Sequence, residues 1–241
     1  MYRQSISIVL PAYNEEENIH KAVSSIVEYV SKHFKNYEII VVNDGSTDRT
    51  KEIVEILAKK IKRVKLTSFT RNRGLYGRTL RRGFKRASYD LIFYTDSDNQ
   101  FDITDLTKLM PFINEYDIVA GYRRNRQDPL MRIFIAFVYN LIIRILFNIK
   151  IKDIDCSFKL YKRKVFEDIK LNSETGFIDA EIFIKARKKG FKVTQVGVSH
   201  FPRTKGKTIY EIGRSKAFAL VKPEVPISIF KEIKRLWPEL Q

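Results

Sequence analysis

The stretch DLIFYTDSDNQFD, residues 90–102, is an apolar run that ends in a cluster of acidic residues. The same order of apolar run, polar loop and helix-like segment occurs three times before it. The runs are SISIVL at 5–10, YEIIVV at 37–42 and RVKLTSF at 63–69, and the helix-like segments are 15–32, 48–60 and 75–87. This alternation predicts an α/β fold with a mostly parallel central sheet and helices on both faces.

Four polar loops follow these predicted strands. They are PAYNEEEN at 11–18, NDGSTD at 43–48, TRNRGLYG at 70–77 and DSDNQFD at 96–102. Ligands bind in open α/β sheets at the carboxyl ends of the strands, so the four loops are expected to form one site. Asn14 is expected to start the first helix, and Ser46, Thr47 and Asp48 to start the second.

The pattern changes after residue 120. An arginine-rich segment, GYRRNRQDP at 121–129, precedes a long apolar helix, and the later elements are a strand at 157–161, a helix at 179–189 and a strand at 192–198. No internal repeat or low-complexity linker interrupts them. The sequence therefore predicts one domain over residues 1–210, followed by a basic amphipathic tail at 211–241.

Charge and cysteine content narrow the class of protein. The chain has 45 Lys+Arg against 28 Asp+Glu, a net charge of +17, which indicates a nucleic acid, a phosphorylated substrate or an acidic membrane as partner. Aromatic residues are not interleaved with the basic ones in RKK or RNR, so no nucleic acid is expected. Cys156 stands alone and is expected to be a buried thiol. The first residues lack the pattern of a signal peptide, which predicts a cytosolic chain.

Asp96 and Asp98 lie two residues apart at a predicted strand end, and both carboxylates can face one site there. Two hard oxygen ligands beside a diphosphate suit Mg²⁺ or Mn²⁺, and Gln100 can add a carbonyl oxygen. Aspartates are also common as turn formers and helix caps. We expect that structural role for Asp102 and Asp105.

The other strand ends are suited to a nucleotide. Asp44 follows a strand and precedes Gly45, an arrangement in which a carboxylate can read the edge of a nucleobase. Residues 11–13 and Glu15 occupy the first strand end. An ordinary strand-to-helix turn would use the same residue types, so these patterns are not specific when taken singly.

Taken together, VLPAYNEEENI, VVNDGSTDRT and YTDSDNQFD resemble the family 2 glycosyltransferases of the GT-A fold. Later segments are similar to the polyprenol-phosphate sugar synthases, the dolichol-phosphate mannose and glucose synthase group. These segments are AGYRRNRQDPLMR, DIDCSFKLYKR, GFIDAEIFIKARKKGFKV and VSHFPRTKGKT. The resemblance spans residues 5–210 and implies a GT-A catalytic domain over 1–210, with 211–241 as a candidate membrane-surface anchor.

The resemblance also implies a role for each matching residue, with GDP- or UDP-hexose as donor. It implies that Pro11, Ala12, Tyr13 and Glu15 hold the nucleotide and that Asp44 contacts its nucleobase. It also implies that Asp96, Asp98 and Gln100 bind the metal and through it the diphosphate, and that Arg203 and Lys207 contact the phosphates. Ser97 and Asn99 depart from the commonest family pattern, which has Ala or Gly at the first position and Leu or Gly at the second. Neither departure removes an oxygen ligand.

Two acceptor classes remain open from the residues. A lipid phosphate is already anionic and needs cationic positioning, for which the candidates are Arg123, Arg124, Arg126 and Arg132. A sugar hydroxyl would need a carboxylate base, Asp179 or Glu181. The resemblance favours transfer of mannose or glucose, with inversion, to a polyprenyl phosphate. A nucleotide-sugar-binding module without turnover is a third hypothesis.

The helix expected at 130–149 has one polar stripe, formed by Arg132, Asn140, Arg144 and Asn148. Two arginines interrupt it, and its longest apolar run is seven residues, which argues against a membrane span. A core helix and a helix at the membrane interface both fit, and the resemblance favours the second. It implies a protein peripherally associated with the cytoplasmic face of an anionic membrane.

The tail has a similar ambiguity. Ile229, Phe230, Ile233, Leu236 and Trp237 share one face of a predicted helix. That face predicts either a surface anchor or a helix that caps the core.

Overall fold

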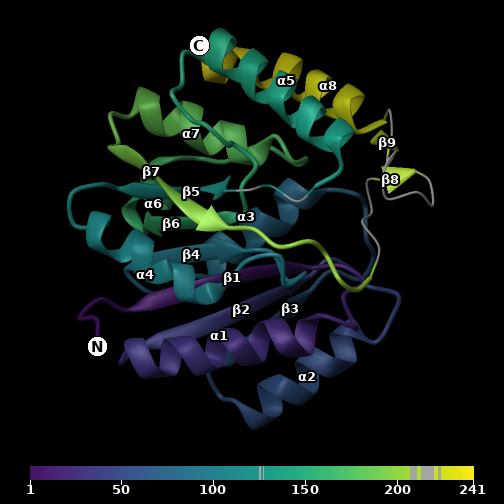
Figure 1. Ribbon diagram of the computed structural model, residues 1–241, viewed down its shortest axis with the longest axis vertical. Helices are drawn as coiled ribbons and strands as arrows, with labels where there is room; N and C mark the ends of the chain where they lie inside the picture. Colours follow the sequence, from purple (N-terminus) through teal and green to yellow (C-terminus); the bar gives the residue numbers. More distant parts are fainter. Residues whose placement is uncertain (125, 127, 207–210, 213–219, 222–223) are drawn as a thin grey trace.

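The computed structural model describes residues 1–124, 126, 128–206, 211–212, 220–221 and 224–241 (Figure 1). Its centre is a seven-stranded sheet with the order β3-β2-β1-β4-β6-β5-β7. The strands are β1 (Ile6–Ala12), β2 (Tyr37–Asn43), β3 (Val64–Ser68), β4 (Leu91–Thr95), β5 (Ile118–Arg124), β6 (Phe158–Lys162) and β7 (Val193–Ser199). All neighbouring pairs are parallel except those of β6, which is antiparallel to β4 and β5. The mostly parallel sheet is confirmed.

Helices cover both faces of this sheet (Figure 1). One core cluster packs β1, β2 and β4 against α1 (Ile19–His33), α2 (Thr50–Lys60), α4 (Leu106–Leu109) and the short helix η2 (Met110–Phe112). A further short helix, η1 (Ile103–Asp105), directly precedes α4. The other packs the opposite face against α3 (Tyr76–Arg86), α5 (Leu130–Phe147), α6 (Lys164–Asp168), α7 (Ile178–Lys188) and α8 (Glu224–Leu240). A separate two-stranded ribbon consists of β8 (Glu211–Ile212) and β9 (Leu220–Val221).

Burial explains why the first strands read as continuous apolar runs. Every residue of β1, β2 and β4 is buried, because helices lie on both sides of the sheet there. Cys156 is also buried, with no exposed surface, and burial raises the pKa of its thiol to about 12. The expectation of a buried thiol is confirmed.

The first helix begins later than expected. Asn14 was predicted to start it, but α1 begins at Ile19, and Asn14 has a φ of 53°. Its side-chain oxygen instead accepts a hydrogen bond from Thr47 N at 2.8 Å. Asn14 therefore joins the first strand-end loop to the second. The Asp48 prediction is confirmed, since Asp48 Oδ1 accepts from Thr50 N at 2.9 Å as α2 begins.

Helix α5 points its polar stripe toward the protein and most of its apolar side chains outward, the reverse of an ordinary surface helix. Asn140, in its polar stripe, is 4% exposed, and its side-chain oxygen accepts from Ile154 N at 2.8 Å. The apolar side chains that face outward are Leu130, Met131, Phe134, Phe137, Leu141, Ile142, Ile145 and Leu146. The structure excludes the core-helix interpretation, because most of this helix is not buried.

Among the helices that the structure describes, α5 alone is long and apolar enough to cross a membrane. Its 18-residue window has a mean hydropathy of 2.0, and 22% of that window is buried. Its two arginines, the residues on which the sequence argument against a membrane span depends, lie among its less exposed residues. Arg144 donates to Asn140 O at 3.1 Å.

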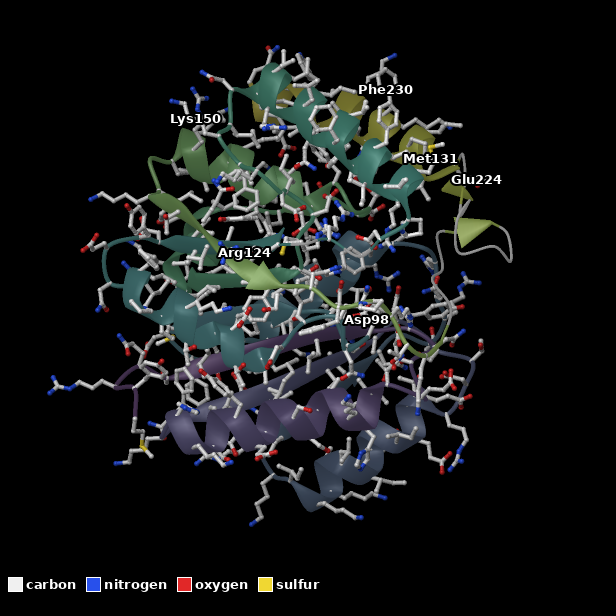
Figure 2. The ribbon with its side chains drawn as sticks, in the orientation of Figure 1. Asp98, Arg124, Met131, Lys150, Glu224 and Phe230 are labelled. Carbon is white, nitrogen blue, oxygen red and sulfur yellow. The ribbon has the colours of Figure 1, made fainter. Side chains whose placement is uncertain are left out.

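Helix α8 packs on the same side of the sheet as α5 and α7. Leu236 and Leu240 are buried, and the rings of Trp237 and Phe147 lie 5.5 Å apart. Phe230 remains 70% exposed. Figure 2 shows Met131 of α5 and Phe230 of α8 at the same end of the molecule, away from α1 and α2. Part of the predicted apolar face of the tail thus covers the core, while Phe230 extends the exposed apolar surface of α5.

Candidate active site

A cavity of about 150 Å³ opens at the carboxyl ends of β1, β2 and β4. Ten residues that the sequence predicted line it together: Pro11, Ala12, Tyr13, Glu15, Asp44, Asp96, Asp98, Gln100, Arg132 and Arg203. They come from loops far apart in the chain. The shared site expected at the strand ends is therefore present.

A larger hollow, about 690 Å³, lies elsewhere on the surface and contains none of the predicted site residues. Its lining includes Lys162, Lys164 and Arg163. The two lysines pair with Asp117, and Arg163 pairs with Glu167. Because this hollow lacks the paired carboxylates Asp96 and Asp98, we place the chemistry in the smaller cavity.

Asp96 is held by two hydroxyl groups. Tyr76 OH donates to its Oδ1 at 3.0 Å, and Ser157 Oγ donates to its Oδ2 at 2.6 Å. Tyr76 OH also contacts Tyr94 OH. Such contacts fix the orientation of a carboxylate before it meets a ligand.

Asp98 lies in the same loop with its side chain 12% exposed. Burial and the neighbouring Asp96 raise the pKa of its carboxyl to about 7, against the opposing effect of Arg203. Its Oδ1 accepts from Gln100 N at 3.1 Å. Gln100 Nε2 donates to Phe201 O at 3.1 Å, so its side-chain oxygen is the atom able to bind a cation.

These residues fit a divalent cation that is shared with a substrate. Burial and then the neighbouring Asp96 carboxylate raise the pKa of Asp98, so a bound cation would favour its ionised form. In the described part of the chain, no three His, Cys, Asp or Glu side chains form a complete metal site. Two carboxylates and an amide oxygen match the incomplete ligand sets that Mg²⁺ uses with substrate phosphates.

Arg203 connects this carboxylate pair to the first strand end. Its Nη2 lies 2.6 Å from Glu15 Oε1 and 2.7 Å from Oε2, and its Nη1 lies 3.5 Å from Asp98 Oδ2. Gly206 N donates to Glu17 Oε2 at 2.9 Å. The segment 201–206 is thus fastened beside the cavity. Lys207, the other predicted phosphate ligand, lies outside the described residues.

Asp44 occupies the second strand end. Burial raises the pKa of its carboxyl to about 6, and its Oδ2 accepts from Asn72 Nδ2 at 2.9 Å. Gly45 follows with a φ of 68°, and a Cβ there would lie 2.3 Å from the backbone of Arg71. Only glycine allows the two loops to approach this closely.

The arginines of the 121–132 region have different surroundings. Arg123 is 8% exposed and donates to both oxygens of Asp153, at 2.8 and 2.7 Å, so its role is within the scaffold. The side chain of Arg124 lies over Gly197 of β7. Arg126 and Arg132 both contact Asp128, and of the four only Arg132 lines the cavity.

The two candidate bases do not line the cavity. Asp179 is 4% exposed and lies 2.5 Å from Lys159 Nζ, which has no exposed surface. Glu181 is also fully buried, where it accepts from Asn172 N at 2.9 Å and Ser173 N at 2.8 Å. The geometry corrects the interpretation of Glu181, whose carboxylate fixes the loop before α7.

Asp102 caps a helix as expected, whereas the side chain of Asp105 makes no capping hydrogen bond to α4 and binds the end of β7 instead. Asp102 Oδ1 accepts from Thr104 N at 2.9 Å at the start of η1, and Asp105 Oδ2 accepts from Ser199 N at 2.7 Å. The sequence left five lining residues unassigned: Asn72, Gly74, Tyr76, Thr79 and Ser97. The first three belong to TRNRGLYG, a loop recognised by its position but not residue by residue.

The sheet order, with β6 reversed, and the paired carboxylates at its edge define a GT-A fold. The chain belongs to glycosyl transferase family 2, whose family model, "Glycosyl transferase family 2", matches residues 7–170. Both the fold and the family expected from the sequence are confirmed.

Named relatives and solved structures agree with this membership. The chain is 32% identical over 208 residues to glycosyltransferase AglD of Haloferax volcanii (82% of this chain, 33% of that protein). It is 32% identical over 213 residues to dolichyl-phosphate beta-glucosyltransferase ALG5D of Trichomonas vaginalis (80% and 64%). It is 29% identical over 210 residues to undecaprenyl-phosphate 4-deoxy-4-formamido-L-arabinose transferase of Pectobacterium atrosepticum (86% and 63%). The chain thus spans a third to just under two thirds of these relatives.

A similar solved structure is glucosyl-3-phosphoglycerate synthase of Mycobacterium tuberculosis, in complex with Mn²⁺ and uridine-diphosphate-glucose. The TM-score is 0.70 at 17% identity, over 99% of this chain and 79% of that one. This similarity supports the fold.

Proposed function

We propose that the protein transfers a hexose, mannose or glucose, from a GDP- or UDP-sugar to a polyprenyl phosphate. One observation carries the proposal: Arg132, at the start of the outward-facing apolar helix α5, lines the same cavity as Asp96 and Asp98. A lipid phosphate and a nucleotide diphosphate can therefore meet there. Two of the relatives are named for dolichyl and undecaprenyl phosphate, which supports this acceptor class.

The donor would occupy the strand-end loops. Residues 11–13 and Asp44 line the side of the cavity that would hold the nucleoside, and Asp44 would meet the base. Glu15 acts through Arg203 in this proposal, because both its oxygens contact that guanidinium. Arg203 would then place its positive charge beside the diphosphate.

Asp96, Asp98 and Gln100 would hold Mg²⁺ or Mn²⁺ together with the diphosphate oxygens. The bound cation would supply positive charge to the departing nucleoside diphosphate. Tyr76 and Ser157 keep the Asp96 carboxylate in place for this role. A solved structure of the same fold contains Mn²⁺ with its sugar nucleotide, which is consistent with a divalent cation.

The acceptor phosphate would bind at Arg132, with Arg126 beside it. A phosphate ester is already anionic near neutral pH, so its oxygen can attack the anomeric carbon without strong help from a base. This agrees with the absence of Asp179 and Glu181 from the cavity lining. Direct attack on the face opposite the leaving group inverts the anomeric centre.

The outward face of α5 and α8 would lie on the cytoplasmic surface of an anionic membrane. Phe134, Ile145 and Phe230 are 62%, 71% and 70% exposed, which leaves large apolar side chains in water unless a lipid surface covers them. Cations flank this face, among them Lys150 at the end of α5 and Lys231 on α8. We propose peripheral contact, in which the lipid phosphate reaches the cavity from the membrane surface.

Replacing Phe134 and Ile145 by serine should weaken binding to vesicles that contain anionic lipid. We expect about tenfold for each apolar side chain that no longer enters the interface. Co-sedimentation with such vesicles measures the effect. Ile56→Ser on α2, which also removes an exposed isoleucine (44% exposed), is the matched control and should bind normally. Unchanged binding of the double variant would refute this orientation.

Metal affinity should fall in acid. Burial and Asp96 raise the pKa of Asp98 to about 7 in the metal-free protein, and a cation binds only the ionised carboxylate. Mn²⁺ affinity is therefore expected to fall about tenfold per pH unit below about 7. The stability of the metal-free protein changes with pH in the opposite direction. Because the folded form binds the proton of Asp98 more readily than the unfolded form, the free energy of unfolding declines as the pH rises from about 4 to about 7. Mn²⁺ titrations by EPR at several pH values would test the predicted fall in metal affinity, and a constant affinity between about pH 4 and about pH 7 would contradict it.

A donor panel tests the proposed function. GDP-mannose, GDP-glucose, UDP-glucose and UDP-galactose are each incubated with a short polyprenyl phosphate, with Mg²⁺, Mn²⁺ or EDTA. We expect one of them to release nucleotide when lipid phosphate and metal are both present. Release that is indifferent to the lipid phosphate, or no release with any donor, would contradict the proposal.

A further inference from the structure

Asp128 lies between β5 and α5 and is surrounded by guanidinium groups. Its side chain is 2% exposed. Arg126 Nε lies 2.5 Å from Oδ2, Arg132 Nη1 lies 3.2 Å from Oδ1, and Arg123 Nη1 lies 3.8 Å from Oδ2. The ion pairs of a carboxylate this buried differ from those on the surface, which contribute little to stability. Removal of this carboxylate would leave partly buried guanidinium groups without their counter-charge.

The three arginines are not equivalent. Arg123 is already bound through two hydrogen bonds to Asp153 and is 8% exposed. Arg126 and Arg132 are 16% and 30% exposed, so they can still meet a ligand. Asp128 therefore joins two partly exposed arginines to a third that is fixed in the scaffold.

The position of Asp128 on the chain sets where these two arginines lie. Pro129 precedes the first residue of α5, and Asp128 pairs with Arg132 one helical turn later. This pair holds the Arg132 guanidinium at the start of the helix, on the side opposite the exposed Leu130 and Phe134. A guanidinium carries five N–H donors in a planar fork that matches the oxygens of a phosphate.

Building on the proposed function, we propose that Asp128 is a positioning residue for the acceptor. It holds Arg126 and Arg132 on one carboxylate so that both guanidinium groups can bind a single lipid phosphate. The site lies between the cavity and the start of α5, a helix whose outward side chains are apolar, which suits a phosphate attached to a hydrocarbon chain. Asp128 itself would not touch the acceptor, because a carboxylate repels a phosphate.

Binding of a short polyprenyl phosphate to the full chain, measured by calorimetry without donor, tests this role. Asp128→Asn keeps the shape and removes the charge, and we expect it to weaken binding about tenfold to a hundredfold. Asp128→Glu restores the charge and should recover most of the affinity. Asp117→Asn is the control, since Asp117 is buried and pairs with Lys162 and Lys164 outside the site. Its affinity should stay within about twofold of wild type.

A double-mutant cycle separates positioning from general destabilisation. If Asp128 acts through Arg126 and Arg132, then Asp128→Asn should add little to the loss already caused by replacing both arginines by glutamine. Additive losses, or a folded Asp128→Asn variant with wild-type affinity, would overturn the proposal. If Asp128→Asn does not fold, Asp128→Ser takes its place in the cycle, because it also removes the charge. Wild-type protein that fails to bind the lipid phosphate would also overturn it, whereas binding without sugar transfer would count against the proposed function alone.

Discussion

Asp98→Asn is expected to lower metal-dependent transfer at least about a thousandfold while the protein stays folded. An amide keeps the size of the side chain but loses the negative charge that would bind the divalent cation. The cation would then no longer be held on the diphosphate, and the leaving group would lose its stabilisation. Initial rates at saturating Mn²⁺, together with Mn²⁺ binding by EPR, measure both effects.

Stability distinguishes this loss from unfolding. Burial and Asp96 raise the pKa of Asp98, so the ionised carboxylate is unfavourable in the folded metal-free protein. Asp98→Asn should therefore be at least as stable as wild type above about pH 7. Asp102→Asn is the matched control in the same loop, since Asp102 caps η1, and it should stay active with a small loss of stability. Metal-dependent activity of Asp98→Asn within about tenfold of wild type would refute the metal assignment.

Lys159→Met is expected to cost about 3–5 kcal/mol of unfolding free energy, the largest stability effect that we predict. Lys159 has no exposed surface, and its Nζ lies 2.5 Å from Asp179 Oδ1. Removing the ammonium leaves Asp179 buried without its cation. Urea denaturation followed by circular dichroism measures the loss, and a variant as stable as wild type would show that the pair contributes nothing.

The double variant Lys159→Met, Asp179→Asn tests the role of Asp179 as well. It removes both charges, so we expect it to recover much of the stability lost in the single variant. If Asp179 is structural, this folded double variant should still transfer sugar to a lipid phosphate. An inactive but stable double variant would instead support Asp179 as the base of an enzyme that glycosylates a hydroxyl.

Local pattern was sufficient for most strands of the sheet and for most of the cavity lining, but it missed β5, whose second half was interpreted as an arginine-rich segment. The runs before Asp44 and Asp96 alternate with helical segments, and parallel strands bring their carboxyl ends to one edge without further information. The loop at 70–77 was recognised in the same way. Its contact with Asp96 through Tyr76 OH could not be predicted, because it depends on how α3 packs against β4.

The arginines and acids of the second half needed the tertiary structure. Arg123, Arg124 and Arg132 look alike in sequence, but the insertion of β6 between β4 and β5 places Asp153 against Arg123. Glu181 was a candidate catalytic base from the sequence, but two backbone N–H groups of the preceding loop donate to its carboxylate. Side-chain direction and partners, rather than residue type, decide such roles.

The inverted face of α5 is a related case. Its polar stripe was visible in the sequence, but the stripe alone did not say which side faces the protein. The hydrogen bond from Ile154 N to Asn140 fixes that side inward and leaves the apolar side chains outside. This orientation supports the proposal that α5 contacts a membrane surface.

The most direct test compares polyprenyl phosphate with the matching polyprenol, and with soluble sugar acceptors, using the labelled donor that the panel selects. Labelled sugar should appear in the organic phase as a polyprenyl phosphosugar only with the phosphorylated lipid, because Arg126 and Arg132 are proposed to bind its phosphate. Transfer to a soluble hydroxyl acceptor, with none to polyprenyl phosphate, would contradict the proposed function.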